Sequence, residues 1–146
     1  MNKVERLSHF GILLIALCAL FISIWQVRIV QQHNRLTVKP YLDYSIIQEE
    51  DSHRVTFSNQ GFGPAILKEL SFVYQGKKYD GLYQVLDAAG ERKNVTGSYT
   101  YGENSIFAPG VDKLLVHLRE RRFRNIQVVM VYESIYEGQF RLTFEF

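Results

Sequence analysis

The sequence has a single cysteine, Cys18, and that residue lies in an apolar run near the N-terminus. A disulfide within the chain is excluded, so the downstream residues must fold without a covalent cross-link. Proline is also scarce, because only Pro40, Pro64 and Pro109 occur among 146 residues. Residues 40–146 are numerous enough to bury a hydrophobic core of their own. We therefore expect one disulfide-free domain rather than a small cross-linked scaffold.

Strong charge of either sign is missing as well, since the formal net charge is only +2. Residues 40–146 carry slightly more acidic than basic side chains, and the basic excess falls in residues 1–39. Nucleic-acid binding requires a basic face on the folded domain, so no nucleic-acid partner is predicted. Basic residues beside an apolar run instead favour the anionic headgroups of a lipid bilayer.

Motifs of catalysis and metal binding are also missing. No serine stands in a Gly-x-Ser-x-Gly motif, and the lone cysteine lies where lipid would surround it. The acidic tripeptide Glu49–Asp51 lacks the alternating ligands of a calcium loop and is typical of a solvated hairpin tip. Of the four histidines, His53 is expected in a polar strand position and His117 on the outward side of a strand, and no pair has metal-ligand spacing. The sequence therefore predicts a protein that is not an enzyme and that uses neither a cofactor nor a metal.

What the sequence does contain is a long apolar run. Residues Leu7–Val27 carry no formal charge and are bounded by Arg6 and Arg28. As a helix this run would be about 31 Å long, which matches the hydrocarbon core of a bilayer. A cleaved signal peptide and a buried soluble helix are the alternatives, but the apolar stretch continues past its only small-x-small site, Ala16–Cys18. We predict a short tail over residues 1–9, a transmembrane helix over 10–30 and a juxtamembrane connector over 31–39.

The side of the membrane on which the downstream domain lies is harder to predict. Basic residues are nearly balanced across the anchor, and Trp25 is placed near its downstream interface. A bacterial-looking N-terminal anchor commonly exports the domain downstream of it. We expect a single-pass membrane protein with an extracytoplasmic C-terminal domain, and a cytoplasmic domain is the alternative.

Small and polar residues recur within the anchor at alternating spacings of four and three. This pattern places them on one side of the helix, where small side chains permit close helix packing and polar ones can form hydrogen bonds across it. Alanine and serine also occur in anchors without such a role. The predicted packing seam, for self-association or for another membrane protein, consists of Ile12, Ala16, Ala19, Ser23 and Gln26.

Downstream of Pro40 the apolar residues alternate at period two. Strands are expected around residues 42–46, 55–57, 66–74, 99–101, 106–108, 114–118, 126–132 and 140–146, with an irregularity at Lys68 and an inward-pointing Phe146. Residues 81–88 have helical spacing, and residues 90–97 are expected to be a loop. An all-β, immunoglobulin-like sandwich of seven to eight strands over residues 40–146 is the predicted fold, and a small β-barrel is the alternative.

Two further segments stand out. Gly61, Gly63 and Pro64 are read as a strand-to-strand corner with positive φ at the glycines, because Pro64 removes a donor that a phosphate loop would need. The basic run after residue 118 is typical of a solvated loop, and contact with headgroups or an acidic partner is the alternative. The residues for that contact are Arg119, Arg121, Arg122, Phe123 and Arg124.

The segments HNRLTVKPYL (residues 33–42) and NQGFGPA (residues 59–65) resemble those of small bacterial single-pass membrane proteins of unassigned function. The resemblance covers the end of the anchor and the first strands, and it implies an inner-membrane location without any catalytic residue. We expect a membrane-anchored interaction or scaffold module that belongs to a membrane complex. A ligand-sensing or effector domain that signals through the anchor is the alternative.

Overall fold

The computed structural model describes residues 3–50, 52–119 and 125–146, and the chain divides into two compact units, Met1–Thr37 and Val38–Phe146. The first unit is the helix α1 (Lys3–Thr37). Its segment Ser8–Thr37 is long and apolar enough to cross a membrane, and its most apolar part is not buried by other residues. Residues 3–9, which were expected as a short tail, continue the helix. The connector is helical as far as Thr37, just before Pro40.

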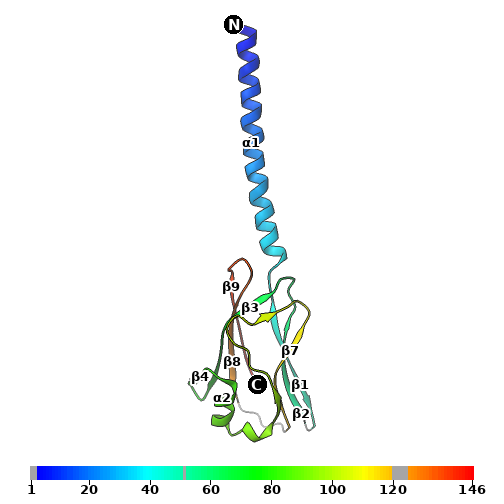
Figure 1. Ribbon diagram of the computed structural model, residues 1–146, viewed down its shortest axis with the longest axis vertical. Helices are drawn as coiled ribbons and strands as arrows, with labels where there is room; N and C mark the ends of the chain where they lie inside the picture. The colour runs from blue at the N-terminus through cyan, green and yellow to red at the C-terminus, as the bar shows by residue number, and fades with distance from the viewer. Residues whose placement is uncertain (1–2, 51, 120–124) are drawn as a thin grey trace. The chain divides into compact units, whose positions relative to one another are not determined.

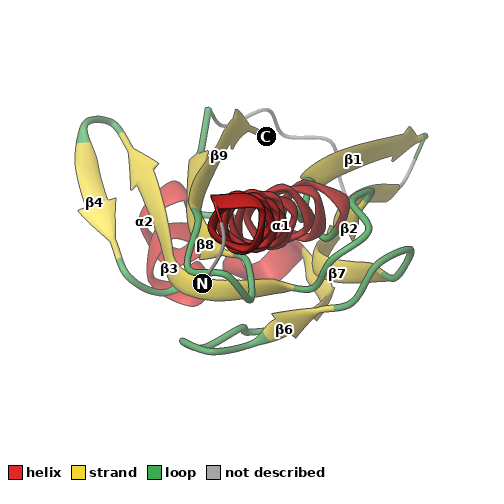
Figure 2. Cartoon of the chain, turned by 90° about the horizontal axis from the view of Figure 1, so that it is seen from above, coloured by secondary structure: helices red, strands yellow, loops and turns green. Residues whose placement is uncertain are grey.

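The second unit is mostly β and consists of two antiparallel sheets packed face to face (Figures 1 and 2). The first sheet has the order β1 (Leu42–Glu49), β2 (Ser52–Asn59), β7 (Asp112–Leu118), β5 (Val95–Ser98). The second has the order β4 (Lys77–Tyr79), β3 (Ala65–Tyr74), β8 (Gln127–Glu133), β9 (Gln139–Glu145), and β6 (Ile106–Phe107) pairs with the first residues of β3.

The core lies between the sheets and is rich in aromatic rings. Phe57 of β2 is fully buried and makes edge contacts with Phe107 and Phe144, at 6.2 and 5.7 Å between ring centroids. Phe146 is 9% exposed, and its backbone N–H and C=O pair with Ile126 at 3.0 Å each. The alternation that predicted inward residues in β2 and β9 is confirmed, because period-two burial is a local property of a strand.

Two of the long strands, β3 and β7, contain irregularities that move side chains to the other face. The register of β3 against β8 shifts between Leu67 and Glu69, as the irregularity predicted at Lys68 requires. The register of β2 against β7 shifts as well, and Leu115 and Val116 are consequently both fully buried. The sequence pattern did not reveal this second shift, since two adjacent apolar residues also occur in ordinary strands.

The middle of the chain departs from the prediction. Residues 95–98 form β5 where a loop was expected, and residues 99–101 are not a strand. The strand β4 was not predicted either, because it is three residues long and contains two lysines. The predicted short helix is confirmed as α2 (Leu82–Ala89), followed by the 3₁₀ turn η1 (Arg92–Asn94). Leu82, Val85, Leu86 and Ala89 are its buried residues.

Candidate functional site

One end of the sandwich receives the chain from residue 38 onward, and we call it the junction end. At its centre lies Asn59, the last residue of β2, whose side chain is completely buried. The Asn59 amide nitrogen donates to the carbonyls of Gly63 (2.8 Å) and Phe107 (2.9 Å). Its amide oxygen accepts from the backbone N–H of Tyr41 (3.2 Å) and of Gly61 (3.0 Å). One side chain therefore connects three parts of the chain. They are residues 38–41, which we call the lead-in segment, residues 60–64, which we call the corner loop, and β6.

Gly61 and Gly63 are required here by space and not by backbone conformation. Neither has a positive φ, so the expectation of left-handed glycines in this corner is wrong. A Cβ at Gly61 would lie 2.4 Å from the Lys39 carbonyl oxygen, and one at Gly63 would lie 1.8 Å from the Val38 carbonyl oxygen. The lead-in backbone thus packs directly on the two glycines, and we call Asn59, Gly61 and Gly63 the junction clamp.

The junction clamp brings together the two segments that carry the resemblance. Residues 38–41 of the first segment lie against residues 59–63 of the second, and the Gln60 N–H donates to the Tyr41 carbonyl at 2.8 Å. Pro64 follows the clamp, and β3 begins at the next residue, Ala65. Residues 38–41 also contact β9, since the Lys39 ammonium lies 5.1 Å from the centre of the Phe140 ring.

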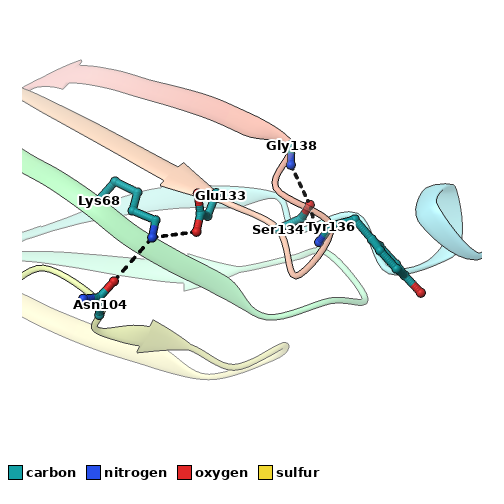
Figure 3. Close-up of polar contacts among 6 residues, drawn as sticks. All are labelled: Lys68, Asn104, Glu133, Ser134, Tyr136 and Gly138. Atoms are coloured by element: carbon teal, nitrogen blue, oxygen red, sulfur yellow. Dashed lines mark hydrogen bonds and ion pairs between the residues drawn. The ribbon is translucent and has the colours of Figure 1, made fainter.

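The loops at the junction end expose apolar side chains. Phe62 is 85% exposed at the tip of the corner loop, between the two clamp glycines. In the β8–β9 turn, the Ser134 hydroxyl accepts from the backbone N–H groups of Tyr136 and Gly138 at 3.3 Å, and the Tyr136 ring points away from the turn (Figure 3). Strand directions place these loops at one end, and their exposed apolar residues are Tyr41, Phe62, Val111, Ile135 and Tyr136.

Close to the junction end, the residue at the register shift of β3 makes polar contacts with neighbouring elements. The Lys68 ammonium lies 2.6 Å from a Glu133 carboxylate oxygen and 3.4 Å from the Asn104 side-chain oxygen (Figure 3). Lys68 is the extra residue of the β3 register shift, so its side chain connects β3 to β8 and to the loop before β6. The Glu133 side chain is only 18% exposed, so solvent screens this ion pair less than it would screen a fully exposed one.

One cavity lies away from the junction end, and a second lies close to it, at the start of β7. The first, of about 240 Å³, is lined by Ile46, Gln48, His53, Asn125, Glu145 and Phe146. The second, of about 410 Å³, is lined by Tyr99, Tyr101, Asp112, Lys113 and Leu114. Burial raises the pKa of the Tyr101 hydroxyl, which donates to the Leu114 carbonyl at 2.6 Å.

The histidines and carboxylates are placed partly as expected. His53 was expected at a polar position of its strand, and this is wrong. It shares the inward face of β2 with Val55, is only 5% exposed and lines the smaller cavity. His117 is half-buried and bonds to the Ser52 hydroxyl at 2.7 Å. Glu91, which the sequence did not single out, is 1% exposed and accepts from the Asn94 amide at 2.7 Å. Among the residues that the structure describes, no group of three His, Cys, Asp or Glu side chains is arranged to hold a metal.

The predicted packing seam lies on α1, where Ile12, Ala16, Ala19, Ser23 and Gln26 are all exposed. The Ser23 hydroxyl donates to the Ala19 carbonyl at 2.9 Å within the helix. Of the basic run, Arg119 is exposed and its N–H donates to the Asn94 carbonyl at 2.8 Å. The rest of that run, Arg121, Arg122, Phe123 and Arg124, lies outside the described residues.

Comparisons with known proteins add no assignment: no protein-family model matches the chain, and no curated protein matches it.

Proposed function

We propose that this protein is a non-catalytic interaction module of a membrane complex, held in the bilayer by α1. The observation that carries the proposal is the set of exposed apolar loop residues at the junction end, with Phe62 at 85% exposure. Exposed apolar side chains that gather in one region favour a protein or membrane contact. The junction clamp supports the same role, because it ties residues 38–41 to β2, to the corner loop and to β6.

Within the bilayer, the predicted seam is the proposed contact. Its test is a disulfide scan of the full chain in membranes, with Cys18→Ala as background and single cysteines along residues 12–26. We expect dimer yields that peak at Ala16, Ala19 and Ser23 and fall at Leu14, Phe21 and Trp25, with the period of a packed helix. Where the partner is another protein, a photoreactive residue at the seam positions gives one discrete product and none at the control positions. Uniform yields in both experiments would contradict the proposal.

The fold we propose is immunoglobulin-like. Its support is the strand order, because β1-β2-β7-β5 corresponds to strands A, B, E and D of that fold and β4-β3-β8-β9 to strands C′, C, F and G. The short β6 is an addition between strands D and E. This type of sandwich serves many binding proteins, but the fold alone assigns no function.

The proposed location is the bacterial inner membrane with the sandwich in the periplasm. The basic residues that flank the anchor are nearly balanced and so favour neither side. The periplasmic side is supported instead by the common behaviour of N-terminal anchors, which export the domain downstream of them. A reporter enzyme joined to the C-terminus tests the side, provided that a linker separates it from the buried Phe146. Activity of a reporter that folds only outside the cytoplasm is expected, and activity of a cytoplasmic reporter alone would place the sandwich inside.

A ligand-sensing domain is the second candidate function. The observation that favours it is the cavity of about 410 Å³, where Tyr99 and Tyr101 stand beside Asp112 and Lys113. Its volume is at the low end of the range of small-molecule sites. In addition, Tyr101 already uses its hydroxyl for the Leu114 carbonyl, and the Lys113 ammonium lies 5.8 Å from the centre of its ring. The interaction role therefore has the stronger support.

A further inference from the structure

The two open sides of the sandwich differ in how their edge strands are protected. On one side, β4 is three residues long with two lysines, and β5 is four residues long with a register shift between Val95 and Gly97. Helix α2 packs there on β3 and β4 (Figure 2). Its Tyr83 hydroxyl lies 2.6 Å from the Ser98 hydroxyl of β5. Short, interrupted or lysine-rich edges that a helix covers are the usual protection against pairing with another strand.

The opposite side has long and regular edges. Every residue of β1 from Leu42 to Glu49 has a partner on β2, and β9 pairs with β8 from Gln139 to Glu145, both without a register shift. Neither strand contains a proline or a lysine. These strands are the outer members of their sheets, and in the described part of the chain no further strand pairs with them. This side therefore lacks the protection that the other side has.

The backbone groups of β1 that face outward can be identified. In an antiparallel strand, the N–H and C=O of one residue point to the same side, and successive residues alternate. The Leu42 N–H donates to the Tyr132 hydroxyl at 3.3 Å and the Tyr44 N–H to the Asp43 carboxylate at 2.8 Å, so even-numbered residues face away from β2. The backbone groups of Ile46 and Gln48 consequently point to the free edge.

The side chains of β1 present two different faces beside that edge. The inward face is apolar, because Ile46 lines the cavity of about 240 Å³ together with His53 and Phe146. The outward face carries Asp43 and Glu49. Their direct neighbours on β2 are Ser58 and Ser52, which carry no charge, and Arg54 lies on the same face opposite Ile47, at the next position from Glu49.

We propose that the free edge of β1 binds an extended peptide segment of a partner protein by β-strand addition. The bound segment alternates apolar side chains, which cover the cavity at Ile46, with basic side chains, which lie opposite Asp43 and Glu49. A second copy of this chain is a poorer occupant, because β1 paired with itself would bring acidic residues together. This inference deepens the proposed interaction role, on which it rests, by naming a surface of the sandwich and the chemistry of its partner.

The test uses the full chain in detergent micelles and a synthetic heptapeptide in which lysine and valine alternate. We expect binding of this peptide and slower hydrogen exchange at the Ile46 and Gln48 amides when it is bound. A peptide of the same sequence with every second backbone amide N-methylated cannot extend a sheet. It should bind at least about tenfold more weakly, the size expected from the loss of one or two backbone hydrogen bonds.

Proline variants identify the edge. Gln48→Pro removes an N–H that points away from β2, so β1 stays paired while its free edge is blocked. Thr143→Pro does the same at β9. Phe146 exchanges both of its backbone hydrogen bonds with Ile126, so the backbone groups of odd-numbered residues in β9 point away from β8. Gln48→Pro should weaken peptide binding at least about tenfold, and Thr143→Pro should leave it unchanged. Asp43→Asn with Glu49→Gln should also weaken binding, whereas Asp87→Asn with Glu103→Gln should not.

Equal binding of the N-methylated peptide, equal binding by folded Gln48→Pro, or no binding at about 1 mM peptide would overturn the proposal. Weakening by Thr143→Pro alone would also overturn it and assign the contact to β9. These outcomes are independent of the seam, since the disulfide scan along α1 tests the membrane contact in a protein whose β1 is unchanged.

Discussion

At the scale of single residues, Asn59 concentrates more hydrogen bonds than any neighbouring position in the junction clamp. The Asn59 amide forms hydrogen bonds with four backbone groups. Without the amide, these backbone groups would lose that hydrogen-bond partner. Asn59→Ala should therefore lower the free energy of unfolding by about 2–4 kcal/mol, measured by denaturant unfolding of the full chain in detergent. The neighbouring Gln60 is exposed, so Gln60→Ala is the control, with a change within about 0.5 kcal/mol. Similar losses in both variants would contradict this role of Asn59.

Gly63 gives a second prediction at this scale. Its Cβ would meet the Val38 carbonyl oxygen, which belongs to backbone and cannot rotate away. Gly63→Ala should lower the free energy of unfolding by about 2 kcal/mol or more. At Gly102 nothing lies within 4 Å of an added Cβ and φ is not positive, so Gly102→Ala should be neutral or slightly stabilising. A thermal melt of the two variants decides, and equal melting temperatures would show that the lead-in segment does not pack on Gly63.

At the scale of strands and helices, β9 supplies the last side chains of the core. Phe144 is 5% exposed, stacks on Tyr44 at 4.1 Å between ring centroids, and contacts Phe57. Phe144→Ala should cost about 3–4 kcal/mol of unfolding free energy, because it removes an aromatic ring from between the sheets. The adjacent Thr143 is exposed and points to the opposite face, so Thr143→Ala should change stability by less than about 1 kcal/mol. A smaller loss for Phe144→Ala than for Thr143→Ala would mean that β9 has the opposite register.

How much of the fold could be predicted from the sequence depends on how local each signal is. The apolar alternation of β1, β2 and β9, the continuous apolar run of β8 and the helical spacing of α2 are visible within a few residues. Strand β5 has only Val95 as an apolar residue, so nothing local distinguishes it from a loop. The double burial of Leu115 and Val116 depends on the register against β2. The junction clamp was missed because Asn59 looks like an ordinary turn residue until Tyr41, 18 positions earlier, is placed beside it.

At the scale of the whole molecule, two partly buried tyrosine hydroxyls make the stability of the sandwich depend on pH. Burial raises the pKa of Tyr101 and of Tyr132 above the ordinary value of 10.0, and the Tyr132 hydroxyl, on the second sheet, accepts from the Leu42 N–H on the first. An unfolded chain ionises these groups at a lower pH than the folded one. Their contribution is therefore fully present below about pH 10 and is lost as the pH rises through the folded-state pKa values.

The free energy of unfolding should consequently fall as the pH rises above about 10, as urea titrations at successive pH values would measure. The double variant Tyr101→Phe, Tyr132→Phe should be less stable at about pH 8 but lose less with rising pH, since neither phenyl ring can ionise. The Glu69 carboxylate raises the pKa of the exposed Lys78 ammonium, whose deprotonation contributes in the same range. Lys78→Gln is therefore the matched control, and its pH slope should stay close to that of the parent chain because solvent screens this pair. An unchanged slope in the tyrosine double variant would show that the loss at high pH arises elsewhere than at these two hydroxyls.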